Sequence, residues 1–366
     1  MSMQPAPSDA ATLARPEVSV IVPARNEETC LAACLESLTG QQGVSFEIIV
    51  VDDGSTDRTA LIARSFPGVR LIEAGPLPDG WSGKSNAVFA GAQQAHGEWL
   101  LFTDADTIHL PGSLARALDE ATRRGVGMLS YSPAQELHGF VERAVMPVIF
   151  AELAAEYKPR EVSDPNSPAA AANGQYLLIT RQAYDAIGGH AAIATCLLED
   201  VELARAVKRS GHKIRFRFGG DAVRTRMYRS FAQLVEGWTK NLVLLFRAPA
   251  RLALTRLLEF LAMVCGLAFV ALSRSDVRLA VLAAVAVALI YLNFMRRILK
   301  AHAGAVSSAL AICGLPIFSY LLLRSKLYYK WRRSVTWKGR RYSTETLSPK
   351  EERRTSARPA GEPWSI

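Results

Sequence analysis

Short apolar runs recur along the first third of the chain and are separated by amphipathic stretches. The runs are rich in Val, Ile and Leu, as expected of strands buried in a parallel sheet. They occupy residues 18–23, 46–51, 69–72 and 99–102. The stretch after the first run has apolar residues at helical spacing and predicts a helix over residues 27–38. Its inner face would be formed by Leu31, Cys34, Leu35 and Leu38.

The later connections between these runs also predict helices. An Asp-Gly turn follows the second run, and we expect a helix to begin there with Ser55 or Thr56 as its cap. A Gly-Lys pair precedes another predicted helix over residues 87–95. Four strand-then-helix units in succession indicate an α/β fold with a mostly parallel, Rossmann-like sheet.

Three long apolar runs dominate the last third of the chain. They cover residues 257–273, 279–295 and 303–323, and the third meets the roughly 20 residues needed to span a bilayer. Three such runs in succession favour membrane helices over buried helices of a soluble protein. In the third run, Gly314 and Pro316 predict either a kink or a re-entrant turn.

Two further stretches have the pattern of helices at a membrane surface. Residues 140–157 interleave large apolar residues with Glu and Arg and are interrupted by Pro147, and core packing is an equal alternative. Residues 231–246 are the second stretch, with Trp238 as an amphipathic anchor. Residues 158–168 are rich in Pro, Asp and Ser and predict a mobile loop that closes over a ligand.

Composition narrows the classes of partner. The formal charge of +9 and the pI of about 9.4 are partly due to residues 324–341, where basic side chains suit anionic lipid. No basic face with stacking aromatic residues is recognisable, so we expect no nucleic acid. The five cysteines lie among apolar residues and predict reduced thiols. No apolar signal segment precedes Pro16, and the last 20 or so residues are expected to be disordered.

Carboxylates follow two of the predicted strands. Alternating residues of an extended chain point the same way, so Asp104 and Asp106 in LFTDADT can face one hard cation that holds a diphosphate. A solvated turn or a helix cap is the commoner explanation of an isolated pair. Asp53 follows the second run, where ligands bind in open α/β sheets. Its alternative role is only to form the turn before the next helix.

Two more charged residues stand at the starts of predicted helices. A Walker A motif would need a glycine where Pro78 stands, so Lys84 in GWSGKSNA does not belong to a P-loop. A lysine at a helix start still suits an anion, with a solvated lysine as the alternative. Asp200 in LLEDVELA is either an ordinary partner of the helix dipole or a general base for an attacking hydroxyl.

In this order the segments resemble the family-2 glycosyltransferases with the GT-A fold, over about residues 18–245. The matching segments are VSVIVPARNEE, VDDGSTD, GWSGKSNA, LFTDADT, NGQYLLITR with the later IGGH, and LLEDVELA. The resemblance implies an inverting transferase that uses a nucleotide-diphosphate sugar and Mn²⁺ or Mg²⁺. It implies that Asp104 and Asp106 bind the metal and that Asp200 is the catalytic base. It also implies a nucleotide-sugar pocket lined by Pro23, Ala24, Arg25, Glu27, Asp53, Lys84 and Asp104.

One departure from the broader family concerns the (Q/R)xxRW motif of lipid-directed and processive members. Trp238 is present, but Gly237 replaces the arginine and Leu234 the first residue, which disfavours a processive synthase. The form RMYRSF followed by GWTKN instead resembles bacterial membrane-associated glycosyltransferases of carotenoid and hopanoid pathways. The resemblance then implies that Tyr228, Arg229 and Trp238 lie at the mouth for the acceptor or the diphosphate.

The expected function is therefore a metal-dependent, inverting hexosyltransferase that moves a sugar, with a UDP-sugar as the favoured donor, to a membrane lipid. The acceptor group would be a hydroxyl or a carboxyl, on a carotenoid, another terpenoid or another lipid. A polyprenyl-phosphate or ceramide-type glycosyltransferase is the alternative. A nucleotide-binding scaffold without activity is a more distant one.

The expected organisation has five parts. They are a disordered N-terminus (1–17), a GT-A domain (18–226), an interfacial region (227–250), transmembrane or re-entrant helices (251–325) and a basic cytoplasmic tail (326–366). Residues 324–341 contain eight basic residues and no acidic one, and the GT-A domain must meet cytosolic nucleotide sugar. Both should therefore lie on the cytoplasmic side of a bacterial inner membrane. Three full crossings would separate them, so we expect the third apolar run to be re-entrant or interfacial.

Overall fold

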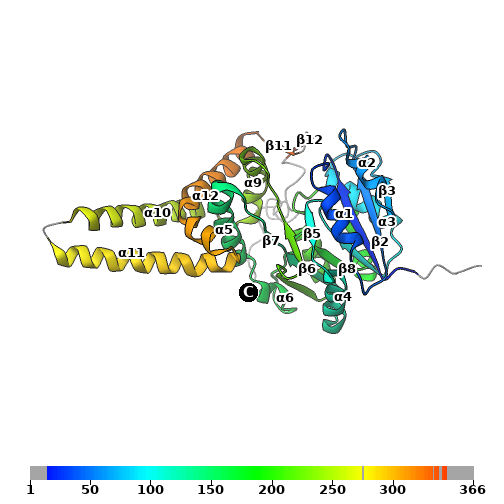
Figure 1. Ribbon diagram of the computed structural model, residues 1–366, viewed down its shortest axis with the longest axis horizontal. Coiled ribbons are helices and arrows are strands. Elements are labelled where there is room, and N and C mark those ends of the chain that lie inside the picture. Colours follow the sequence, from blue (N-terminus) through cyan, green and yellow to red (C-terminus); the bar gives the residue numbers. More distant parts are fainter. Residues whose placement is uncertain (1–14, 274–275, 333, 338–339, 344–366) are drawn as a thin grey trace, which may run out of the picture.

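The computed structural model describes residues 15–273, 276–332, 334–337 and 340–343. Its centre is a seven-stranded sheet in the order β3-β2-β1-β4-β8-β6-β9 (Figure 1). β8 runs antiparallel to both of its neighbours, so the other six strands share one direction and the sheet is mostly parallel, as predicted. The strands are β1 (Val18–Ala24), β2 (Phe46–Asp52), β3 (Val69–Glu73), β4 (Trp99–Phe102), β6 (Met128–Ser132), β8 (Leu177–Thr180) and β9 (Ile214–Phe218).

Helices cover both faces of this sheet because its strands are apolar on both sides. In β1, Val20 and Val22 pack on one face together with α1 and α4, whereas Ile21 packs on the other with α3 and α8. The predicted inner face of α1 is fully buried. These helices and their neighbours are α1 (Leu31–Thr39), α2 (Thr59–Arg64), α3 (Gly83–Gln94), α4 (Ser113–Arg124), α6 (Pro159–Ser163), α7 (Arg181–Ala186), η1 (Gly189–Ile193) and α8 (Glu199–Arg209).

The first two helices begin later than their sequences predict. α1 starts at Leu31 and not near residue 27, and α2 starts at Thr59 and not at Ser55 or Thr56. The two preceding loops hold each other instead. The Ser55 hydroxyl accepts from the backbone N–H of Asn26, at 3.0 Å, and the Asn26 side chain accepts from the N–H of Thr56, at 2.8 Å. Asn26 has a positive φ of 53°, which ends any helical path there.

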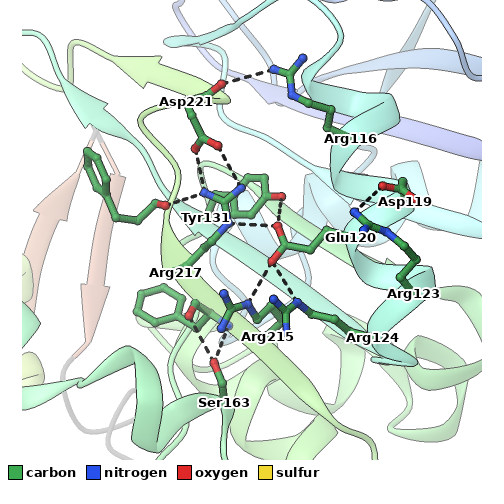
Figure 2. A network of polar contacts seen from close by, with 12 residues as sticks. Arg116, Asp119, Glu120, Arg123, Arg124, Tyr131, Ser163, Arg215, Arg217 and Asp221 are labelled. Carbon is green, nitrogen blue, oxygen red and sulfur yellow. Dashed lines mark hydrogen bonds and ion pairs between the residues drawn. The ribbon is translucent and has the colours of Figure 1, made fainter.

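A polar network fastens α4 to the back of the sheet (Figure 2). Glu120 of α4 accepts hydrogen bonds from Arg215 and Arg217 of β9, each at 3.0 Å, and from the hydroxyl of Tyr131 at 2.8 Å. Arg217 also pairs with Asp221 at 2.7 Å. Burial raises the pKa of Glu120, but the hydrogen bonds from Tyr131, Arg215 and Arg217 outweigh it and lower that pKa to about 2.

A second sheet has three strands. It has the order β5-β10-β7, from Thr107–His109, Val223–Thr225 and Ala134–Gln135. β5 begins directly after the Asp104–Asp106 turn, so this small sheet fixes the far side of the turn. A hairpin of β11 (Ser334–Trp337) and β12 (Arg340–Ser343) forms a third sheet.

Three apolar helices follow the domain built on the seven-stranded sheet, and they are long enough to cross a membrane by length and composition. α10 (Pro249–Leu272) and α11 (Val277–Ile298) run side by side away from the domain (Figure 1), and only 11% and 6% of their most apolar windows are buried. α12 (Ala305–Arg332), which follows the short turn η2 (Leu299–Ala301), differs because half of its window is buried. It packs against α5 (Gly139–Glu156), α9 (Phe231–Leu245) and α10.

Several details of the membrane-proximal region differ from the predictions. α12 is continuous through Pro316, and α5 is continuous through Pro147. A Cβ on Gly314 would lie 2.0 Å from the carbonyl oxygen of Ala144, so the glycine serves close packing of α12 on α5 and not a turn. Trp238 is 3% exposed and packs inside, so it is not an anchor at the surface. The 158–168 segment contains the packed helix α6. The predicted disordered ends lie outside the described residues, apart from residues 15–17.

Candidate active site

One cavity of about 660 Å³ opens where the parallel strands end. All twelve residues that the sequence analysis assigned to the site line this cavity, although they come from six different parts of the chain. Their shared position does not test the role of each, which stays a prediction. They are Pro23, Ala24, Arg25, Glu27, Asp53, Lys84, Asp104, Asp106, Asp200, Tyr228, Arg229 and Trp238.

The two carboxylates of LFTDADT occupy a turn and not the end of an extended strand. β4 stops at Phe102, and Asp104 and Asp106 lie in the turn before β5. The argument from alternating residues was therefore wrong about the local structure, although both side chains do line the cavity. In the part of the chain that the structure describes, no group of three or more His, Cys, Asp or Glu residues forms a metal cage. Two carboxylates fit Mg²⁺ or Mn²⁺, which take their remaining ligands from substrate phosphates and water.

Lys84 bridges two acidic residues of the cavity. Ser82 caps α3 through its side chain, which accepts from the N–H of Ser85, and Lys84 stands in the first turn. The Lys84 Nζ atom lies 2.8 Å from Asp104 Oδ1 and 3.0 Å from Glu199 Oε1. Burial lowers the pKa of Lys84, but the charges of Asp104 and Glu199 outweigh it and raise that pKa well above its usual value. The lysine is therefore a fixed cation in the floor of the site.

Asp200 stands in the first turn of α8, next to Glu199. One carboxylate oxygen accepts from the backbone N–H of Gly174 at 2.9 Å. Burial, and then the negative charge of Glu199, raise the pKa of Asp200 to about 6, while Lys84 opposes this shift. A Cβ on Gly174 would lie 2.9 Å from Lys84 Nζ, so the glycine lets the lysine approach this corner. A carboxylate with this pKa is ionised at neutral pH and can still accept a proton.

Sequence reasoning missed three charged residues of the site. Glu199 is adjacent to Asp200 in LLEDVELA, and its role as the partner of Lys84 becomes visible only in the fold. Lys240 of α9 lines the same cavity, where burial lowers its pKa and the charge of Glu199 opposes the shift. Arg340, from the basic segment assigned to lipid, contacts Asp53. No local sequence signal distinguishes Arg340 from its basic neighbours.

The predicted acceptor mouth is an aromatic cluster beside these charges. Tyr228 and Trp238 are buried with ring centroids 6.0 Å apart, and Phe150 of α5 meets Trp238 edge to face at 6.2 Å. A Cβ on Gly237 would lie 2.5 Å from the Tyr228 hydroxyl oxygen, which explains why the motif's arginine has no room here. Arg229 is exposed at the rim.

The other end of the cavity is largely apolar. Its wall is formed by residues of α5, β9 and the connection that follows α11, where His302 stacks on Phe218 with centroids 4.0 Å apart. The cavity therefore runs from the charged corner of Lys84 and Asp200 to the base of the α10–α11 hairpin. The residues of its apolar wall are Phe150, Leu153, Ala154, Tyr157, Phe216 and Phe218.

Comparison with known proteins agrees with this architecture. The family model described as glycosyl transferase family 2 matches residues 19–179. A 4,4'-diaponeurosporenoate glycosyltransferase from Staphylococcus aureus (strain USA300) is 28% identical over 89% of this chain and 88% of its own length. The solved structure of the mannosyltransferase PcManGT from Pyrobaculum calidifontis, in complex with GDP-Man and Mn²⁺, has a TM-score of 0.54 at 17% identity. That alignment covers 87% of this chain and 88% of the mannosyltransferase. The chain is therefore a glycosyltransferase with the GT-A fold, and its residues 19–179 match the model of glycosyl transferase family 2.

Proposed function

We propose that this protein is an inverting, divalent-metal-dependent glycosyltransferase that moves one sugar from a nucleotide-diphosphate sugar, with UDP-sugar favoured, to a membrane lipid. The observation that carries the proposal is the continuity of the cavity. Its charged corner contains Lys84, Asp104 and Asp200, and the lining that includes its apolar wall extends to residues 300–302, just after the exposed helix α11. A polar donor and an apolar acceptor can therefore meet at the carboxylate of Asp200.

The donor would lie along the ends of β1, β2 and α3. Asp53 is buried at the end of β2 and suits the nucleoside, while the first turn of α3 and Lys84 suit the phosphates. Asp104 and Asp106 would hold Mn²⁺ or Mg²⁺, which supplies positive charge to the departing diphosphate. Lys84 adds a second positive charge at the same place, so that charge developing on the leaving group meets a preformed cation.

Asp200 would act as the general base. An acceptor hydroxyl must lose its proton as it attacks, and a positioned carboxylate accelerates such a step by about 100- to 10,000-fold. The hydrogen bond from Gly174 fixes the orientation of the Asp200 carboxylate. With one base and no protein nucleophile, attack opposite the departing phosphate inverts the anomeric carbon.

The acceptor class follows from the apolar wall and from the relative in S. aureus. That relative is named for 4,4'-diaponeurosporenoate, and the ending of the name denotes a carboxylate. We propose a carotenoid-type or other terpenoid lipid with a hydroxyl or carboxyl end, because aromatic and aliphatic residues of α5 and β9 line the approach to Asp200. Polyprenyl phosphate and ceramide are the alternative acceptors.

The membrane would hold the α10–α11 hairpin as two crossings. Most of the surface of both helices faces away from protein, as a lipid-facing helix requires, whereas α12 packs on α5 and α9. Two crossings leave the catalytic domain and the basic segment after α12 on one side. The nucleotide sugar and the excess of Lys and Arg both favour the cytoplasm of a bacterial cell as that side.

The test is to incubate membranes that contain the protein with a panel of radiolabelled nucleotide sugars and to extract the lipid. The proposal expects label in the organic phase with one donor, dependent on added divalent cation, and none with an Asp200→Asn variant. Incorporation by Asp200→Asn at the wild-type rate would contradict the base assignment. Absence of label with every donor and a carotenoid acid, polyprenyl phosphate or ceramide would contradict the lipid acceptor.

A further inference from the structure

A residue of the C-terminal hairpin contacts Asp53, which lines the proposed donor half of the cavity. Arg340, the first residue of β12, forms an ion pair with the carboxylate of Asp53, and its second terminal nitrogen donates to the Asp53 carbonyl oxygen at 3.4 Å. The Asp53 side chain is 8% exposed and that of Arg340 is 24% exposed. The contact joins positions 287 residues apart.

The guanidinium of Arg340 fills the space in front of α3. A Cβ on Gly83 would lie 2.1 Å from Arg340 Nη1 and 2.5 Å from Asp53 Oδ2, so only glycine leaves room for the pair at this position. Ser82, which caps α3, and Lys84 flank Gly83 on either side. Arg340 therefore stands between Asp53, which suits the nucleoside, and the helix turn that suits the phosphates.

The hairpin that carries Arg340 is held by elements of the site itself. Its strands pair antiparallel, with Trp337 opposite Arg340, and β11 packs against α9 and α12. α9 also contributes Trp238 and Lys240 to the cavity wall. The position of Arg340 is thus fixed relative to the donor pocket by the same helix that lines it.

We propose that Arg340 is a donor-binding residue, which rests on the proposed function of the cavity as a nucleotide-sugar site. A guanidinium carries five N–H donors, and Asp53 uses two of them in the free protein. The other N–H donors of the guanidinium can bind the diphosphate. The ion pair also neutralises the buried Asp53 carboxylate, whose charge would otherwise repel the phosphates beside it. The C-terminal hairpin then forms one wall of the donor site.

The experiment measures binding of UDP and of GDP, each with Mn²⁺, to the full-length protein in lipid nanodiscs by titration calorimetry. Arg340→Ala should weaken binding of the nucleotide that wild type prefers by about 10- to 100-fold, the loss expected for a charge-assisted hydrogen bond. Arg340→Lys should retain only part of the wild-type affinity for the nucleotide, because one ammonium group cannot bridge Asp53 and a phosphate as a guanidinium can. Arg123→Ala, an exposed arginine on α4, is the matched control and should bind like wild type.

The outcomes separate this inference from the proposed function. If wild type binds neither nucleotide, the proposed function fails. If wild type binds a nucleotide and Arg340→Ala binds it equally well, the inference is wrong. Tighter binding by Arg340→Ala would also overturn it, because Arg340 would then compete with the donor for the site. A thermal unfolding scan verifies that each variant is folded. Should Arg340→Ala unfold, Arg340→Gln, which keeps the size and hydrogen-bond donors, must still show a loss of affinity.

Discussion

The ammonium group of Lys84 lies 2.8 Å from the carboxylate of Asp104, so a proposed metal ligand has a protein cation as its partner when no donor is bound. A metal ion that binds Asp104 in the free enzyme must therefore compete with this lysine. Once the donor is present, its phosphates give Lys84 another partner. We expect the metal and the donor to bind with positive coupling for this reason.

This competition predicts two opposite effects of Lys84→Met. Mn²⁺ should bind the variant several-fold more tightly in the absence of nucleotide, because the competing cation is gone. Turnover should fall by about 100- to 1,000-fold, because the departing diphosphate loses a preformed positive charge. Electron paramagnetic resonance titration of free Mn²⁺ measures the first effect and a transfer assay the second. Lys158→Met is the control, since Lys158 pairs only with Glu161 in the described contacts and is 60% exposed. Weaker Mn²⁺ binding by Lys84→Met would contradict the competition.

The raised pKa of Asp200 predicts the pH dependence of transfer to a hydroxyl. A base acts only when ionised, so the rate should rise with pH through about 6 and level off above it. Asp200→Asn should lower the rate by about 100- to 10,000-fold and abolish the rise. A carboxyl acceptor, with a pKa near 4, is already ionised at neutral pH and needs no base. The rate of transfer to it should therefore fall much less in Asp200→Asn. Rates measured for a matched alcohol and acid between pH 5 and 8 distinguish the two acceptor groups.

The network around Glu120 predicts a loss of stability without a loss of chemistry. Glu120→Gln removes the anion that Arg215 and Arg217 share, and should destabilise the fold by about 1–3 kcal/mol at neutral pH. Because folding lowers the pKa of Glu120, its contribution is present above the ordinary glutamate pKa and is lost as pH falls towards 2. Thermal unfolding of detergent-purified protein measures the change. Asp119 is exposed, so Asp119→Asn should have no comparable effect on stability. Equal losses of stability in both variants would contradict the role of Glu120.

Packing of α12 on α5 predicts an unusual sensitivity to one methyl group. In Gly314→Ala, the new Cβ would lie 2.0 Å from a backbone oxygen of α5, so the helices must separate at a cost of about 1–3 kcal/mol. Gly304→Ala is a matched control in the same region, because a Cβ there would meet nothing within 4 Å. We expect a lower melting temperature and weaker lipid transfer only in Gly314→Ala. If the two variants behave alike, α12 does not depend on this contact.

Much of the catalytic fold was predictable because its strands are buried on both faces. The ends of the four predicted strands were correct to within one residue, although β6, β8 and β9 of the same sheet were not predicted, and the buried face of α1 was correct residue by residue. The predicted start of α1 was wrong. The side chains of Asn26 and Ser55 bind backbone groups about 30 residues away in the sequence, and these bonds replace the first helical turn. Such bonds leave no periodic signal in the sequence.

The membrane-proximal half was harder to predict for a different reason. Hydropathy identified all three apolar helices, but it cannot distinguish a helix that faces lipid from one that packs on protein. Gly314 looked like a break, whereas its role depends on Ala144, far away in the sequence. Likewise, the basic segment after α12 fits a lipid surface by composition, and only the fold brings Arg340 to Asp53.

The contact between Arg340 and Asp53 also sets an order of events during synthesis. A ribosome makes Asp53 early, but it makes Arg340 only after α10, α11 and α12 have been synthesised. A nascent chain whose catalytic domain has already folded therefore still lacks one wall of the proposed donor pocket. Completion of that pocket is in this way tied to completion of the membrane helices, close to where an apolar acceptor would be found.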